Sequence, residues 1–105
     1  MFVAITTSPL KNKKYRATVY RVIEDLEIPD LAEPVTVDFG DSRYEDYTIH
    51  KDKERRDKYL LRHTTNEDWK NPLTAGFWSR WLLWNKPSLK KSAIDITNRF
   101  GITFI

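Results

Sequence analysis

Four side chains that can ligate a metal ion lie close together in the sequence. They are His50, Glu54, Asp57 and His63, spaced four, three and six residues apart. Imidazole nitrogens and carboxylate oxygens are the ligands that zinc and related transition metals take in proteins. Asp57 does not fall on the same helix face as His63, so the four side chains do not converge. We therefore predict no metal site, and a solvated helix face on which Glu54 and Lys58 form an ion pair.

A second pattern, Asp68-Trp69-Lys70, has the D-x-K form of some metal-dependent nucleases. Such sites need these residues on a strand, whereas Asn71-Pro72 follows at once and favours a loop. The sequence also lacks a glycine-rich phosphate-binding motif and holds three glycines in all. No serine or threonine is marked as a nucleophile by a neighbouring histidine. We predict that the protein is not an enzyme and holds no cofactor.

All four tryptophans lie between positions 69 and 84, and no acid follows until position 95. In a helix, Phe77, Trp81 and Trp84 would share one face. A helix that is apolar nearly all round must be buried on most sides, which a small domain achieves with difficulty. Two interpretations stay open: most rings form the core, or some bind a partner protein, because tryptophan and arginine dominate interface energetics. The partner-binding set is Phe77, Trp78, Arg80, Trp81 and Trp84, with at least one tryptophan partly exposed beside Arg80.

Four lysines interleave with these aromatic residues, namely Lys70, Lys86, Lys90 and Lys91. Aromatic rings that stack on bases and cations that contact phosphates are the combination found in nucleic-acid-binding proteins. No RRM, KH, zinc-finger or helix-turn-helix signature accompanies the combination. Nucleic-acid binding through these lysines is therefore the alternative prediction.

These side chains must be positioned by a small set of strands and helices. Residues 2–7, 14–23 and 35–39 are rich in Val, Ile, Thr and Tyr and predict strands, with Gly40 ending the third. Residues 23–34 hold two prolines and many acids and predict an exposed connection. Helices are predicted after the N-caps Asp52, Thr74 and Ser88, the second running over 75–85 and the third ending at Gly101. The sequence predicts an α+β fold, with a small antiparallel sheet of three to four strands packed against two to three helices.

Composition limits the class of protein. The 105 residues suit a single domain spanning 1–105, and the absence of cysteine excludes disulfides and thiolate zinc sites. No stretch reaches the length of a membrane span, and the opening MFVAITTS lacks the basic start of a signal peptide, so we expect a protein that is not secreted by that route. Charge comes in blocks: residues 1–23 carry five bases and no acid, and residues 24–46 carry nine acids and one base. Such blocks favour oriented contacts with a charged partner.

The sequence also resembles a known group of proteins. The resemblance is seen in residues 37–40, residues 44–52 (YEDYTIHKD), Tyr59, Arg62-His63 and the segment GFWSRWLLWNKPSL. Over roughly residues 35–100 they are similar to small proteins encoded by nucleocytoplasmic large DNA viruses, relatives of the chloroviruses and giant viruses. The resemblance implies a viral protein, found in the virion or in the cytoplasm or nucleus of the infected cell.

Two functions follow as expectations. The leading one is a non-enzymatic structural protein, a minor capsid or capsid-associated component that binds viral capsid or other virion proteins and self-associates. In that role Trp78, Trp81 and Trp84 dock into a neighbouring subunit while Arg80 makes directional hydrogen bonds. The alternative is a small basic DNA- or RNA-binding protein that acts in genome packaging or viral gene expression.

Overall fold

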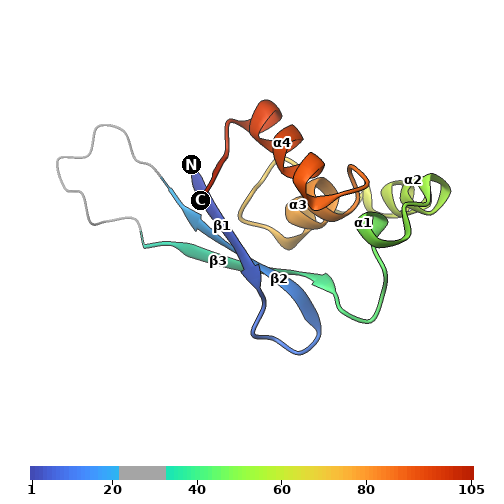
Figure 1. Ribbon diagram of the computed structural model, residues 1–105, viewed down its shortest axis with the longest axis horizontal. Helices are drawn as coiled ribbons and strands as arrows, with labels where there is room; N and C mark the ends of the chain where they lie inside the picture. The colour runs from blue at the N-terminus through green and yellow to red at the C-terminus, as the bar shows by residue number, and fades with distance from the viewer. Residues whose placement is uncertain (22–32) are drawn as a thin grey trace.

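The computed structural model describes residues 1–21 and 33–105 (Figure 1). The elements in chain order are β1 (Phe2–Thr7), β2 (Lys13–Tyr20), β3 (Val35–Asp41), α1 (Tyr47–His50), α2 (Lys53–His63), α3 (Ala75–Trp78), the π-helical turn η1 (Ser79–Leu83), α4 (Leu89–Phe100) and β4 (Thr103–Phe104). The α+β class is confirmed. Most of the predicted acidic connection, 23–34, lies outside the described residues, so its predicted exposure stays a prediction.

The four strands form one sheet in the order β3-β2-β1-β4. The first three strands pair antiparallel as predicted, whereas β4 pairs parallel with β1, which makes the sheet mixed. Parallel pairing needs a long crossover, and the helices between β3 and β4 supply it. The two chain ends therefore lie side by side (Figure 1).

One face of the sheet carries the core. Alternation along the strands buries Val3, Val19 and Phe39 completely, and the helices cover them with further fully buried residues. The helical side of the core is Phe77, Trp78, Leu82, Leu83 and Ile96. Among residues 1–21 and 33–105, no helix combines the length and the apolar character needed to cross a membrane.

Strand β3 runs further than the alternation predicted. Gly40 lies inside the strand rather than at its end, and Asp41 pairs with Lys13. The φ angle of Gly40 is +80°, a conformation that glycine adopts without steric cost. A Cβ at this position would lie 2.8 Å from Leu83 Cδ1, so the absence of a side chain lets η1 approach the sheet.

The helix ends follow the predicted caps. Asp52 accepts hydrogen bonds from the backbone N–H groups of Glu54 and Arg55, and Thr74 and Ser88 cap α3 and α4 in the same way. Gly101 ends α4 in the left-handed conformation, as predicted. The short helix α1 was not predicted, because its single turn is too brief to show a hydrophobic period.

The prediction of a continuous helix over 75–85 is wrong. Only residues 75–78 are α-helical, and the chain then turns through η1, which closes with a bond from Trp84 N–H to the Ser79 carbonyl. Because π-helical bonds span five residues instead of four, the side chains after Trp78 depart from the 3.6-residue spacing. This shift brings Leu83 into the core, although ideal helical spacing pointed it elsewhere.

We predict that Gly40→Ala destabilises the protein by about 2 to 4 kcal/mol, because the new methyl group meets both a left-handed backbone and the Leu83 side chain. Gly101→Ala is the matched control, since Gly101 also has positive φ but open space around it. It should cost only about 1 to 2 kcal/mol. Urea unfolding of the two variants measures the difference, and equal losses would contradict the packing role of Gly40.

Candidate functional site

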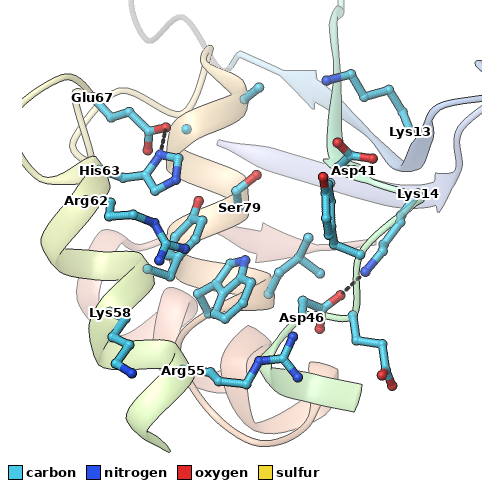
Figure 2. A pocket seen from close by; sticks show the side chains of 18 residues that line it. Lys13, Lys14, Asp41, Asp46, Arg55, Lys58, Arg62, His63, Glu67 and Ser79 are labelled. Atoms are coloured by element: carbon cyan, nitrogen blue, oxygen red, sulfur yellow. Dashed lines mark hydrogen bonds and ion pairs between the residues drawn. The ribbon is translucent and has the colours of Figure 1, made fainter. Parts of the chain in front are cut away.

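A cleft of about 540 Å³ lies between α2, the first residues of β2 and the last residues of β3 (Figure 2). Its floor is formed by α3, η1 and Trp84, and the loop after β3 closes one side. Cavities of this size are typical of ligand-binding sites. Half of the residues that line the cleft are charged, so its electrostatics decide what it can bind.

One wall of the cleft is a basic face of α2. Arg55, Lys58 and Arg62 follow one another at spacings of three and four residues, which places them on the same side of a helix. All three line the cleft, and Figure 2 shows them along one edge of it. Within the described part of the chain, Arg55 and Arg62 take part in no ion pair, while Lys58 pairs with the exposed Glu54.

Aromatic stacking holds this wall in place. The Tyr59 ring is parallel to the Trp84 ring at 4.3 Å between centroids, and the His63 ring stacks on Tyr59 at 4.2 Å. Arg56 adds two contacts, a guanidinium 5.0 Å from the centre of the Tyr47 ring and a hydrogen bond to the Asn85 carbonyl. Burial raises the pKa of Tyr59 well above its ordinary value, so its hydroxyl stays protonated.

The opposite wall comes from β2. Lys14 donates a 2.7 Å hydrogen bond to Asp46, whose side chain is almost fully buried, and this ion pair ties the β3–α1 loop to the sheet. Lys13 also lines the cleft and, among the residues described, forms no ion pair. The cleft therefore has cations on both of its long sides.

Three of the four acids that line the cleft have side-chain hydrogen-bond partners. Asp41 accepts two hydrogen bonds from the Arg43 guanidinium, which lower the pKa of that carboxyl to about 2. Glu67 accepts from the Trp69 indole N–H and lies 2.9 Å from His63 Nδ1. Glu45 is the remaining acid of the lining. Because three of the four lining acids have partners, and three of the five lining bases form no ion pair within the described residues, the cleft favours an anionic ligand.

The pair of His63 and Glu67 invites comparison with a hydrolytic triad, because Ser79 lines the same cleft. A nucleophilic serine needs a hydrogen bond to the imidazole that activates it. None of the hydrogen bonds between described residues joins Ser79 to His63, and Tyr59 stacks over the imidazole. The described geometry therefore does not support a triad of Ser79, His63 and Glu67.

The four residues of the metal-like pattern lie apart from one another. His50 packs on Trp84 and accepts a hydrogen bond from the Asp52 N–H, whereas His63 pairs with Glu67. Glu54 forms the predicted ion pair with Lys58. Across residues 1–21 and 33–105, no three histidine or acidic side chains gather as a metal site requires.

The predicted partner-binding residues divide into two groups. Phe77 and Trp78 are fully buried, and the Trp78 indole donates to the Pro72 carbonyl, so these two rings belong to the core and offer a partner no surface. Trp81 and Trp84 are half-buried. Trp84 uses its ring to hold Tyr59, which leaves Trp81 as the ring that best fits the predicted role.

Arg80 lies beside Trp81, as predicted. Its guanidinium is 4.2 Å from the Trp81 ring centre and 5.3 Å from that of Trp69, and Arg99 also approaches Trp81, at 4.8 Å. Burial lowers the pKa of Arg80, and its Nε is buried without a partner in the described structure. We name Trp69, Arg80, Trp81 and Arg99 the arginine–tryptophan cluster.

Three of the four predicted nucleic-acid-binding lysines lie near one another, and the fourth lies apart. Lys86, Lys90 and Lys91 lie around the start of α4, and all three are exposed. Lys70 lines a separate small hollow with Phe100 and Gly101, at the other end of the same helix. A helix of 12 residues is about 18 Å long. These lysines therefore form no single site.

The sequence interpretation missed the cleft itself. The basic residues of its walls, Lys13, Lys14, Arg55, Lys58 and Arg62, were not among the predicted site residues. A signal was available for one wall, because the spacing of Arg55, Lys58 and Arg62 is that of a helix face. The opposite wall depends on how β2 and α2 pack, which no local pattern shows.

Residues 3–63 match the profile of a protein family described as "Family of unknown function (DUF5754)". The chain belongs to this family. The part of the chain that matches DUF5754 runs from β1 through α2, and it contains all the basic residues of the two cleft walls. No curated protein and no solved structure matches the chain.

The difference in burial between Trp78 and Trp81 predicts different losses of stability when each is replaced. We predict that Trp78→Ala costs about 3 to 5 kcal/mol, because it empties a site packed by Phe39, Phe77 and Phe104. Trp81→Ala should cost about 1 to 2 kcal/mol, since its ring is half-buried. Urea unfolding gives both values, and the reverse ranking would show that Trp81, rather than Trp78, is the main core residue.

Proposed function

We propose that this DUF5754 protein is a non-enzymatic nucleic-acid-binding protein, and that the cleft is where it contacts the phosphate backbone. One observation carries the proposal. Three cations of the α2 face, Arg55, Lys58 and Arg62, stand across a 540 Å³ cleft from the lysines of β2, while most of the acids between them are paired.

Phosphate groups fit this arrangement for physical reasons. A polyanion gains affinity from each cation it neutralises, because bound counterions are released. Arginine guanidinium groups bind phosphate oxygens with two parallel hydrogen bonds, and Arg55 and Arg62 have no competing carboxylate in the described structure. Arg55 and Arg62 can therefore bind the ligand without first breaking an ion pair, whereas Lys58 is paired with Glu54.

We predict that the double variant Arg55→Gln and Arg62→Gln weakens binding of a fluorescein-labelled oligonucleotide by tenfold or more. The slope of log affinity against log salt should fall by about 0.7 to 0.9 for each removed cation. Fluorescence anisotropy at several salt concentrations measures both quantities. Both side chains are exposed, so the fold should be unaffected.

The matched control is the double variant Lys90→Gln and Lys91→Gln. It removes the same charge from an exposed helix face, but neither lysine lines the cleft. We expect this control to lose much less affinity for the oligonucleotide than the double variant Arg55→Gln and Arg62→Gln. Equal losses in the two variants would mean that the protein attracts nucleic acid by net charge alone and that the cleft is not the site.

A second candidate function is protein assembly, favoured by the arginine–tryptophan cluster. Arg80 lies between Trp69 and Trp81 with an unpaired Nε, and residues of these two types dominate interface hot spots. In the virion that the sequence resemblance implies, this surface would contact a capsid or other virion protein, or a second copy of the chain.

Sedimentation velocity tests the assembly function. We predict concentration-dependent self-association that is weakened at least tenfold by Trp81→Ala, with no change in far-ultraviolet circular dichroism. A wild-type protein that stays monomeric at high concentration, or a variant that associates unchanged, would contradict self-association through this surface.

A further inference from the structure

We infer that the cleft selects single-stranded over double-stranded nucleic acid, and that the ring of Tyr44 stacks on one of the bases. This inference rests on the proposed function, since it specifies the ligand of the same site. It is carried by the shape of the cleft, by the cations that line it and by the exposure of one aromatic ring.

The shape of the site favours a flexible strand. The cations of α2 line a cavity whose volume suits a small ligand, and their side chains are exposed to solvent there. A duplex is read by elements that project into its grooves. Because Arg55 and Arg62 line a concave site, a flexible strand can reach them there more easily than a rigid duplex can. A single strand can pass between the two walls with its phosphates toward the cations.

Tyr44 supplies a stacking surface at the same place. It lines the cleft and is 64% exposed, the highest value for any aromatic residue in the described part of the chain. The other large rings around the cleft, Tyr59 and Trp84, are stacked on each other. Tyr44 is therefore the ring that remains for a base, and such stacking is tolerant of base identity.

The loop that carries Tyr44 is restrained by backbone hydrogen bonds and by the neighbouring Arg43. Its N–H donates to the Asp41 carbonyl, and the N–H of Ser42 donates to the Asn12 carbonyl of the β1–β2 turn. The Arg43 guanidinium lies 5.6 Å from the ring centre and is itself held by both oxygens of Asp41. A ring that is already oriented loses less conformational entropy on binding.

Alternative surfaces explain the observations less well. Tyr20 is also exposed, at 41%, but it lies on the sheet and does not line the cleft. Figure 2 shows Ser79 inside the cleft, between the wall of α2 and the wall of β2. The exposed ring of Tyr44 is thus on the same site as the cations.

The test compares a fluorescein-labelled 15-nucleotide oligo(dT) with a 15-base-pair duplex, by anisotropy at one fixed salt concentration. We expect the wild-type protein to bind the single strand at least tenfold more tightly than the duplex. Tyr44→Ala should weaken single-strand binding by about 5- to 100-fold. Tyr44→Phe should bind like the wild type, because it keeps the ring. Tyr20→Ala is the control that removes an exposed ring away from the cleft, and it should bind like the wild type.

The outcomes separate this inference from the proposed function. Equal affinity for the two probes, or unchanged single-strand binding by Tyr44→Ala, would overturn the inference. If Arg55→Gln and Arg62→Gln still weakened binding in that case, the cleft would remain a nucleic-acid site without strand selectivity. Failure of the wild-type protein to bind either probe would overturn both.

Discussion

The stack of Tyr59 on Trp84 is the contact on which the candidate site depends. Tyr59 is the one buried residue of α2, and its ring is nearly parallel to that of Trp84. Stacked aromatic pairs of this kind stabilise by about 0.5 to 1.5 kcal/mol beyond the area they bury. Without this contact α2 would have few apolar contacts with the rest of the molecule. Both rings also line the cleft, so the stack forms part of the site itself.

The tryptophans at positions 78, 81 and 84 contact different parts of the structure. Trp78 closes the core against Phe39, Trp84 holds α2, and Trp81 lies with Arg80 at the surface. The π-helical turn makes this division possible, since it shifts the residues after Trp78 away from regular helical spacing. One short segment thus serves the core, the cleft and a second surface.

Much of the fold could be predicted from the sequence, because its signals are local. The caps Asp52, Thr74 and Ser88, the alternation of Val37 and Phe39, and the left-handed Gly101 all act within one turn or one strand. The parallel pairing of β4 with β1 was not predictable in this way. It joins segments about 100 residues apart, which no local pattern relates.

The site was harder to predict for the same reason. Expectations centred on the aromatic residues and the lysines near them, since these are conspicuous along the sequence. Two of those rings, Phe77 and Trp78, prove to be core, and Lys70 lies at the other end of α4 from Lys90. The basic cleft instead combines β2 with α2, whose cations are separated by some 40 positions in the sequence. Charges that converge only through tertiary packing leave no motif.

The central claim is that the ligand lies in the cleft, and nuclear magnetic resonance tests it most directly. The measurement is a titration of the ¹⁵N-labelled protein with 15-nucleotide oligo(dT), followed through backbone amide and indole N–H signals. We predict that the largest shifts fall in residues 13–14, 41–46 and 55–63, with the Trp81 indole little changed. Shifts confined to residues 69–91, with α2 and β2 unaffected, would contradict the account.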